Sequence, residues 1–414
     1  MLQGGSADAA AASMTAIARM PQATAPARSW PTLVAAVLIN LPTGTLYAFS
    51  VFIPAYEAAH RVGRAEISAM LFSLAAIGYT TGMLLGPLSY RWARPWRLLL
   101  GFGVVIAGGW SLAALAPNLI VLGFAYGVLF GLAGGMSYSV LAQVVNLALP
   151  TERRGFGNGF LVATFSAGAM LLAPVCAWGL ARFGLTATLF GMGAATLITA
   201  AIAAALVRLS GISLAGAAPL HGSERSEHPA WVFLVFWGGF ALAASAGLMS
   251  LSQSAVIVAA YGGALAQAVF GTATVAAAAT LGRLLGGLAV DYLPPKTVIL
   301  GAQGLGALAL ASVLLWPSPA MSVAAMSGAC LGYGLLSGSY AAAMARYYGP
   351  RMFGRMTGRL YTAWGVAALV GPSIAGWVFD RSGGYATAIA LGATAMAGGC
   401  ALSLLLPRTP TRTE

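Results

Sequence analysis

The sequence contains very few charged residues. Only 7% of its 414 residues are Asp, Glu, Lys or Arg, whereas about 25% is usual for a soluble globular protein. This composition excludes a water-soluble enzyme of the ordinary kind. The charge is also one-sided, because 21 basic residues stand against 9 acidic ones and Lys296 is the single lysine. The basic residues fall in short gaps between apolar runs, with no stripe of interleaved aromatic residues, so we expect no nucleic-acid partner.

Cysteine and histidine are also scarce. Three cysteines, Cys176, Cys330 and Cys400, lie far apart inside apolar stretches. They form no CxxC pair and have no histidine spacing typical of zinc, so we expect neither a disulfide framework nor a metal site, and no cofactor. The three histidines lie outside the apolar runs, and those runs contain no HExxH motif, paired Asp or Ser–His pair. These absences predict that the protein is not an enzyme.

Residues 1–29 have no apolar core of the length found in signal peptides. They are rich in Ala, Ser and Thr and contain Arg19 and Arg28. We expect a disordered cytoplasmic tail rather than a cleaved signal peptide.

Long apolar runs fill most of the remaining chain, and 59% of all residues are apolar. A helix needs roughly 20 apolar residues to cross the hydrocarbon core of a bilayer. Twelve segments meet this requirement, at 31–54, 67–88, 98–116, 119–146, 157–179, 185–207, 230–256, 266–290, 297–316, 320–344, 356–379 and 385–406. The sequence therefore predicts an all-α membrane protein with twelve transmembrane helices.

The most polar interior stretch, 208–229, separates the sixth segment from the seventh. We expect it to be a cytoplasmic linker between an N-terminal six-helix bundle (30–207) and a C-terminal one (230–406), with a cytoplasmic tail at 407–414. The basic residues set the orientation. With the N-terminus in the cytoplasm, sixteen basic residues lie inside and four outside, and Arg283 belongs to neither set because it lies deep within a helix. The positive-inside rule therefore places both termini in the cytoplasm.

The two halves repeat each other at an offset of 200 residues. The pairs that coincide without a gap are Gly82/Gly282, Leu84/Leu284, Leu85/Leu285, Gly86/Gly286, Leu88/Leu288 and Pro95/Pro295. Six helices, an even number, separate the copies, so both bundles enter the membrane in the same orientation. Parallel repeats are typical of carriers that bind substrate between the two halves, near the middle of the membrane.

The loop after the second segment reads Gly86-Pro-Leu-Ser-Tyr90-Arg91-Trp-Ala-Arg94. It resembles the Gly-x-Leu-x-Asp-Arg-x-Gly-Arg signature of the major facilitator superfamily, and the resemblance covers essentially all twelve segments. The second copy reads Gly287-Leu-Ala-Val-Asp291. In that family these loops form charge contacts that hold the inward-closed state, which implies gating roles for Arg91, Arg94 and Asp291. Tyr90 departs from the signature, because the family usually has Asp there.

Within the superfamily, the chain resembles the branch of oxalate/formate antiporters and monocarboxylate transporters. The similar pieces are Asn40–Phe52, Gly282–Gly287 and Tyr361–Pro372. Oxalate-exchanging members have a lysine on the eleventh helix, in the region where this chain has Trp364. Proton-coupled members have an Asp one turn before the helix 8 arginine, where this chain has Ala279. The resemblance therefore favours a monocarboxylate over a dianion and implies no buried carboxylate for proton coupling.

Arg283 lies deep inside the eighth segment. A charge there costs about 3 kcal/mol or more, so it indicates a functional site. Its repeat equivalent is Met83, so only one half has the cation, and all nine acidic residues lie in tails, loops or segment ends. A guanidinium presents a planar pair of donors that matches a carboxylate. The alternative roles are a structural salt bridge between helices and snorkelling toward the cytoplasm.

Aromatic residues provide weaker candidates for the same site. Tyrosine can form the wall of an apolar pocket and donate its hydroxyl to a carboxylate, and packing or interfacial anchoring explains each of these residues equally well. The tyrosines in segments that line the cavity of this superfamily are Tyr47, Tyr126, Tyr138, Tyr333, Tyr340 and Tyr361. Trp364 has the same two interpretations, cavity wall and bundle packing.

These features favour a secondary active transporter that moves a small organic anion by alternating access. The expected substrate is a monocarboxylate such as lactate, formate or pyruvate, bound by Arg283. Anion exchange and proton-coupled symport both remain open, with protons as a partner only in symport. A drug or metabolite exporter of the same fold and an oxalate/formate antiporter proper are the alternatives. We expect a monomer, with the lipid bilayer as a partner, in a bacterial inner membrane.

Overall fold

The computed structural model describes residues 29–61, 72–214 and 228–407. Those in the N half (29–214) form α2 (Ser29–Gly44), η1 (Thr45–Phe52), α3 (Ile53–His60), α5 (Leu74–Leu85), η3 (Gly86–Arg91), α6 (Pro95–Ala114), α7 (Leu119–Gly123), η4 (Phe124–Leu132), α8 (Ala133–Ala148), η5 (Thr151–Arg153) and α9 (Arg154–Ser210). Those in the C half (228–407) form α10 (Ala230–Ala260), α11 (Leu265–Tyr292), α12 (Pro295–Leu315), α13 (Pro319–Ser382) and α14 (Ala386–Ser403).

The two longest elements, α9 and α13, each consist of two helices joined at a glycine. Gly184 breaks α9 with φ 77° and Gly349 breaks α13 with φ 70°. Glycine adopts positive φ at little cost, whereas other L-residues do not. Pro350 follows the second break and begins the next helix, where its missing N–H costs nothing. Each element therefore crosses the membrane twice.

The expected all-α architecture with twelve spanning helices is confirmed. Nine helices in the described part of the chain are long and apolar enough to cross a membrane, and two of them contain the breaks in α9 and α13. The remaining span is α5 with η3, which follows residues 62–71, outside the description. Most helices extend a few residues beyond the predicted segments at one or both ends, since helix boundaries are the least certain part of a prediction from sequence.

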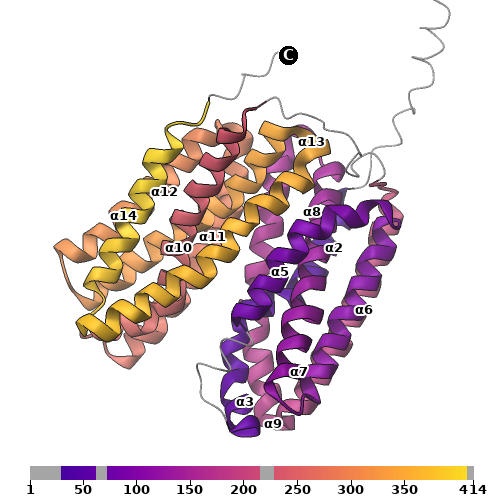
Figure 1. Cartoon of the computed structure of the whole chain (residues 1–414), viewed down its shortest axis with the longest axis horizontal. Helices are drawn as coiled ribbons and strands as arrows, with labels where there is room; N and C mark the ends of the chain where they lie inside the picture. The colour runs from indigo at the N-terminus through magenta and orange to yellow at the C-terminus, as the bar shows by residue number, and fades with distance from the viewer. Residues whose placement is uncertain (1–28, 62–71, 215–227, 408–414) are drawn as a thin grey trace, which may run out of the picture.

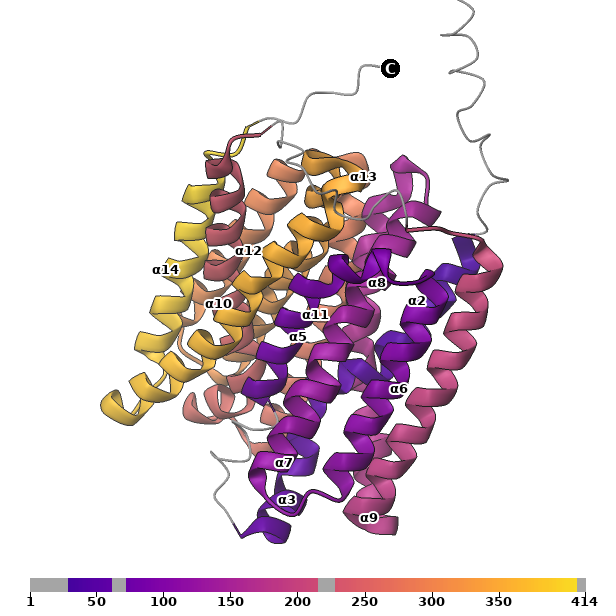
Figure 2. The same cartoon turned by 45° about the vertical axis from the view of Figure 1, so that its right-hand side comes forward.

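The two halves form two bundles that lie side by side, as Figures 1 and 2 show. We call the side where α2 begins and α14 ends the terminal side, and the opposite side the far side. In Figure 1 the bundles meet near the terminal side and lean away from each other toward the far side. Helix α11 packs against α9, and α13 packs against α5 and α8, across the boundary between the halves. We call this boundary the seam.

The repeated glycines explain how each bundle packs. A Cβ at Gly82 would overlap the backbone of Leu132, and a Cβ at Gly282 would overlap the backbone of Leu331. In both halves the glycine therefore lets two helices cross with their backbones in contact. Close crossing of this kind is a common way to hold transmembrane helices together, since lipid provides no hydrophobic drive between them.

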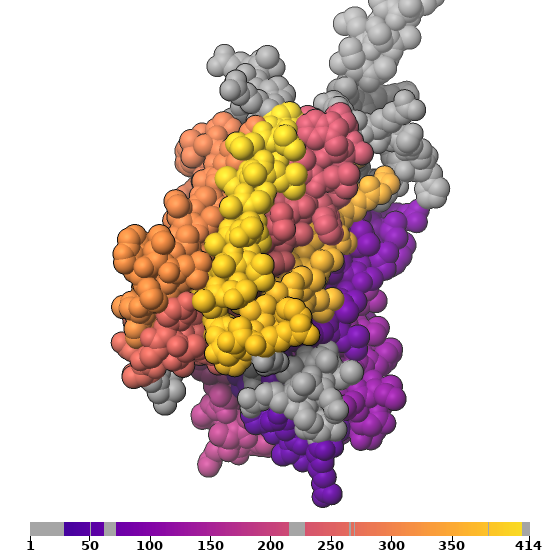
Figure 3. All heavy atoms as spheres, turned by 60° about the vertical axis from the view of Figure 1, so that its left-hand side comes forward, coloured from indigo at the N-terminus to yellow at the C-terminus, as the bar shows by residue number. Residues whose placement is uncertain are grey.

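The outer surface of the bundles is apolar. In Figure 3, α14 crosses the outer face of the C half beside α10 and α12. Large apolar side chains on the outside include Ile198, Leu234 and Leu308, which are 61%, 64% and 73% exposed. Continuous exposed apolar surface is unstable in water and stable against lipid chains. The chain is thus built as an integral membrane protein.

Several expectations fall on residues outside the description. They concern the N-terminal tail, of which only Ser29 is described, the linker between 214 and 228, and the tail after Pro407. The structure therefore leaves the predicted boundaries of tails and linker as predictions.

Candidate functional site

Arg283 lies at the centre of the molecule, on the side of α11 that faces the N half. Its side chain is 2% exposed. Its Nη1 donates a hydrogen bond to the Oγ of Ser166 on α9, so the contact crosses the seam. The guanidinium carbon lies 5.6 Å from the ring centre of Tyr47 and 5.3 Å from that of Tyr333. These rings attract the cation but do not neutralise it.

The hydrogen bonding of this guanidinium is incomplete. Its Nε is buried and forms no hydrogen bond with any described residue. Arginine has five N–H donors, and a buried charged donor without a partner raises the free energy of the protein. An anion that approaches this edge of the guanidinium would therefore be bound favourably.

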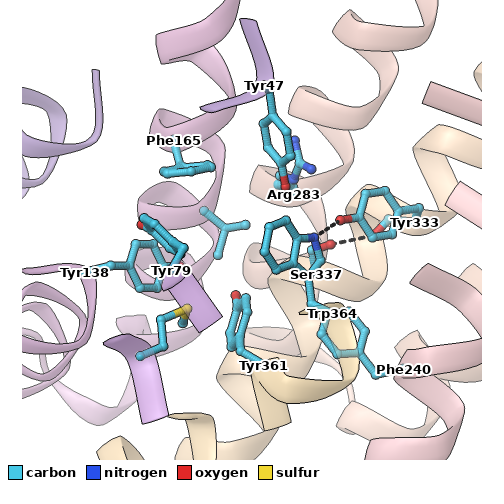
Figure 4. A pocket seen from close by; sticks show the side chains of 12 residues that line it. Tyr47, Tyr79, Tyr138, Phe165, Phe240, Arg283, Tyr333, Ser337, Tyr361 and Trp364 are labelled. Atoms are coloured by element: carbon cyan, nitrogen blue, oxygen red, sulfur yellow. Dashed lines mark hydrogen bonds between the residues drawn. The ribbon is translucent and has the colours of Figure 1, made fainter. Parts of the chain in front are cut away.

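A cavity of about 400 Å³ opens beside Arg283. Figure 4 shows its side chains, which come from both halves. Its lining is Tyr47, Tyr79, Met83, Tyr138, Val162, Phe165, Phe240, Arg283, Tyr333, Ser337, Tyr361 and Trp364. This lining, formed by described residues, contains one cation and no acidic residue. Such a cavity is apolar with a single positive site, which suits a monoanion.

Hydrogen bonds hold part of the wall in place. The Nε1 of Trp364 donates to the hydroxyl of Tyr333 at 3.0 Å, and the Oγ of Ser337 donates to the backbone oxygen of Tyr333 at 2.9 Å. The hydroxyls of Tyr79 and Tyr361 are buried without a hydrogen bond to a described residue, and that of Tyr361 points into the cavity in Figure 4. Both side chains line the cavity, where a tyrosine hydroxyl can donate to a substrate oxygen.

The structure brings together five of the seven residues predicted for substrate binding. Tyr47, Arg283, Tyr333, Tyr361 and Trp364 all line the cavity. Tyr138, proposed with the other tyrosines, lines it as well.

Tyr126 and Tyr340 lie away from this cavity. Tyr126 stacks on Phe130 at 4.6 Å within the N half. Tyr340 packs against Phe240 at 4.9 Å, and its hydroxyl accepts a bond from Gln303 at 3.5 Å, within the C half. Both are packing residues of their own bundle.

Several lining residues were not predicted, namely Tyr79, Met83, Val162, Phe165, Phe240 and Ser337. One signal in the sequence would have found two of them. Met83 is the repeat equivalent of Arg283, and Tyr79 is that of Ala279, one turn away. Equivalent positions of two parallel halves face the same central axis, so the partner of a buried arginine is itself a candidate.

The described residues also contain no candidate metal-binding site. No group of three or more His, Cys, Asp or Glu that could hold a metal ion occurs in residues 29–61, 72–214 and 228–407.

Comparison with protein families identifies the architecture. The model of the Major Facilitator Superfamily matches residues 33–251, slightly more than half of the chain. The chain belongs to the major facilitator superfamily. It is therefore a transporter that lies in a lipid bilayer, and, as expected, it is not an enzyme.

The relatives of this superfamily member are similar at low identity. Mouse monocarboxylate transporter 11 is 27% identical over 416 aligned residues, which cover 92% of this chain and 87% of that protein. The uncharacterized MFS-type transporter YhjX of Escherichia coli is 26% identical over 180 residues, and the match covers 43% of this chain and 44% of YhjX. Monocarboxylate transporter 9 of Pongo abelii is 32% identical over 105 residues, 25% of this chain and 20% of that protein.

Solved structures of the superfamily share the fold. The proton:xylose symporter XylE has a TM-score of 0.71 and 13% identity, with 92% of this chain and 96% of XylE covered. FucP in the outward conformation has a TM-score of 0.62 and 15% identity, with 92% of this chain and 100% of FucP covered. The human organic anion transporter MFSD10 has a TM-score of 0.68 and 15% identity, with 92% of this chain and 100% of MFSD10 covered.

The two signature loops of the superfamily member differ in their contacts. Asp291, at the end of α11, accepts hydrogen bonds from the backbone N–H groups of Gly155 (2.8 Å) and Phe156 (2.7 Å) at the start of α9. A carboxylate at a helix N-terminus is favoured by the helix dipole. This bond joins the C half to the N half on the terminal side. Asp291 thus occupies a position from which it can hold that side closed.

The other loop makes a neutral contact. The hydroxyl of Tyr90 donates to the backbone oxygen of Ser139 at 3.0 Å, within the N half. A Cβ at Gly354 of the C half would lie 2.7 Å from this hydroxyl, so Tyr90 also touches the C half. The side chains of Arg91 and Arg94 are exposed. No hydrogen bond shown for the described residues places either arginine at the seam.

A second cavity, of about 200 Å³, lies between the halves on the terminal side of the first. It is lined by Met83, Tyr138, Ser139, Ala142, Phe353, Gly354, Thr357 and Gly358. Met83 and Tyr138 line both cavities. These two side chains therefore separate the central cavity from the space nearer the terminal side.

Proposed function

We propose that the protein transports a small monocarboxylate by alternating access, and that Arg283 binds the carboxylate. The observation that supports this most directly is a buried guanidinium with an unbonded Nε beside a cavity between the two halves. Two relatives are named monocarboxylate transporters, which agrees with the chemistry of the cavity.

Charge favours a monoanion. One cation and no acid line the cavity among the described residues. A monocarboxylate would neutralise Arg283, whereas a dianion such as oxalate would bring a second negative charge into an apolar space without a cation. Lactate, formate and pyruvate suit such a site.

The contacts suggest how binding permits the conformational change. Arg283 belongs to the C half and its partner Ser166 to the N half. A carboxylate between them would contact both halves and neutralise the cation before the cavity closes. An empty carrier would have to enclose an unneutralised charge, which is costly. We therefore expect exchange to be faster than net transport, and symport to depend on a proton carried by the substrate or by tyrosine and water.

The gates follow from the same geometry. The positive-inside rule assigns the terminal side to the cytoplasm. The bundles meet near that side (Figure 1), which supports an outward-facing state with Asp291 in the closing contact. Met83 and Tyr138 form the inner gate of the central cavity. Arg91 and Arg94 act at the cytoplasmic surface of the same gate. Because all of these gate residues belong to one chain, we propose that the protein works as a monomer, in a bacterial inner membrane.

The test is uptake of labelled lactate, formate, pyruvate and oxalate into proteoliposomes preloaded with each acid. Arg283→Gln should abolish exchange, because the amide is neutral, whereas Tyr340→Phe, outside the cavity, should retain it. Thermal melting would show that both variants are folded. Exchange by Arg283→Gln at the wild-type rate would contradict the binding role of Arg283. If no carboxylate moves, the alternative of a drug or metabolite exporter takes its place.

A second measurement tests obligatory exchange. Uptake into vesicles without internal acid should be at least tenfold slower than uptake into preloaded vesicles. Net uptake as fast as exchange, with no dependence on a proton gradient, would contradict the neutralisation argument.

A further inference from the structure

Three arginines lie along one face of α13 just after its break at Gly349. Arg351, Arg355 and Arg359 follow at four-residue spacing, and all three side chains are exposed. Like charges at this spacing repel each other and destabilise a helix. The start of a helix also carries the positive end of its dipole, which disfavours cations. We call these residues the arginine stripe, and their clustered positive charge favours the approach of an anion from outside the helix.

The arginine stripe lies on the lipid-facing side of the helix. The exposed residues that continue its face further along α13 are Val366, Val370, Ile374 and Trp377. A neighbouring face packs against the N half, because a Cβ at Gly358 would meet the backbone of Met83 and one at Gly354 would meet Tyr90. The stripe therefore borders both the lipid and the seam.

The arginine stripe reaches from the membrane surface into the bilayer. Arg351 and Arg359 are eight residues apart, which is about 12 Å along a helix. Trp237 of α10 donates to Thr362, one turn beyond Arg359, at 2.8 Å. Trp231, 46% exposed, lies six residues before Trp237 on the same helix, or about 9 Å nearer the terminal side. Exposed tryptophans mark the membrane interface, so Arg359 lies somewhat deeper than this level.

The neighbouring surface is also basic. Tyr90, which touches Gly354, is followed by the exposed Arg91. The acidic residues described on the terminal side are Glu152 and Asp291. The carboxylate of Asp291 is bonded to α9, in the part of the seam where α9 and α11 meet. Cations of both halves thus converge where α5 and α13 meet, next to lipid.

We infer that the arginine stripe binds the phosphate of an anionic phospholipid in the leaflet of the terminal side. Guanidinium groups bind phosphate through paired N–H donors. A basic pocket between transmembrane helices is a recurrent site for anionic headgroups. The acyl chains would lie along Val366, Val370 and Ile374. A zwitterionic headgroup fits less well, because its ammonium would approach the same cluster of cations. This site is separate from the transport cavity and does not rest on the proposed substrate.

The experiment compares lipid retention by the full chain and two triple variants. In one variant Arg351, Arg355 and Arg359 become Gln. In the matched control Arg97, Arg153 and Arg208 become Gln, which removes the same charge from the same side. Each protein is equilibrated with mixed micelles of phosphatidylglycerol and phosphatidylcholine. Bound lipid is then counted by native mass spectrometry, and the melting temperature is measured with each lipid alone.

We expect wild type and the control to retain phosphatidylglycerol in preference to phosphatidylcholine and to melt higher in its presence. The stripe variant should retain at least tenfold less phosphatidylglycerol and should no longer melt higher in its presence. Equal loss in both triple variants would overturn the inference in favour of general surface charge. Equal stabilisation of wild type by inorganic phosphate would overturn the lipid as the ligand. If the triple variant does not fold, Arg355→Gln alone should lose most of the preference, and unchanged preference would again overturn it.

Discussion

At the scale of single residues, the site depends on a cation that its own protein does not fully satisfy. Arg283 bonds Ser166, and its Nε remains without a described partner. Ser166 and a bound carboxylate would both accept from this guanidinium. We therefore expect the serine to stabilise the cation in the empty carrier and to compete with the substrate for it.

Replacement of Ser166 by Ala tests this competition. Loss of a hydrogen bond to a buried charged group should cost about 1–3 kcal/mol, so the empty protein should melt at a lower temperature. A bound carboxylate restores the missing acceptor, so the rise in melting temperature on addition of substrate should be larger than in wild type.

Ser337→Ala is the control for this prediction. Ser337 lines the same cavity but bonds only the backbone of its own helix among the contacts shown. Its removal should leave the substrate-induced shift unchanged. Equal shifts in Ser166→Ala and wild type would show that Ser166 does not share the guanidinium with the substrate.

The sequence predicts one part of the site well and another part poorly. Arg283 is evident because a charge in an apolar segment is rare and expensive. Phe165 and Phe240 give no such signal, since aromatic residues occur throughout the spanning helices. The same ambiguity made Tyr126 and Tyr340 candidates, although both pack inside their own bundle. Which face of a helix meets the cavity depends on tertiary packing, which composition does not specify.

At the scale of elements, Gly184 and Gly349 each form a tight turn that joins two spanning helices. The sequence predicts the spans, because their length follows from the thickness of the membrane. It does not identify the breaks, because the chain has 54 glycines and most lie inside helices. Only the backbone conformation shows which glycine is required.

A pair of alanine substitutions with opposite expected signs tests the break in α13. At Gly349, φ is 70° and ψ is 169°, a region that is essentially restricted to glycine and costs another L-residue about 1–3 kcal/mol. Gly349→Ala should lower the melting temperature. Gly376 lies within a helix, with nothing within 4 Å of an added Cβ, and Ala is favoured over Gly there by about 1 kcal/mol. Gly376→Ala should leave the melting temperature unchanged or higher. A drop of the same size in both variants would contradict a special role for Gly349.

The crossing of α9 and α11 provides a second prediction for elements. A Cβ at Gly287 would overlap the backbone of Gly155 and Gly159 across the seam. Gly287→Val should therefore push the halves apart on the terminal side. Spin labels on Arg153→Cys and Tyr292→Cys, both exposed positions next to this crossing, should move apart by several ångströms.

Gly301→Val is the control, because an added Cβ at Gly301 of α12 has nothing within 4 Å. It should leave the distance between the two labels as in the parent protein. An unchanged distance in Gly287→Val would mean that the crossing is not what sets the closure of the terminal side.

At the scale of the whole molecule, two parts of the seam are held by different chemistry: the contact of α9 with α11, and the contact of α5 with α13. The seam of α9 and α11 has a carboxylate, Asp291, on two backbone N–H groups. The seam of α5 and α13 has the neutral phenol of Tyr90, whose hydrogen bonds stay within the N half. A two-state carrier is sensitive to such differences, because a change of 1.4 kcal/mol alters a population ratio tenfold. One ionic contact can thus set the resting state of the transporter.

Asp291→Asn is the direct test of this argument. Hydrogen bonds to a charged group contribute about 1.5–3 kcal/mol, and the amide retains only one acceptor oxygen. The ratio of closed to open molecules on the terminal side should fall by about ten- to a hundredfold, as the distance between labels at 153 and 292 would report. Glu152→Gln removes one acid from the same side without touching the two N–H groups, and should leave the ratio near that of the parent protein. If both substitutions shift the ratio equally, net charge at the surface governs the state. If neither does, the backbone crossing at Gly287 holds the halves together without the carboxylate.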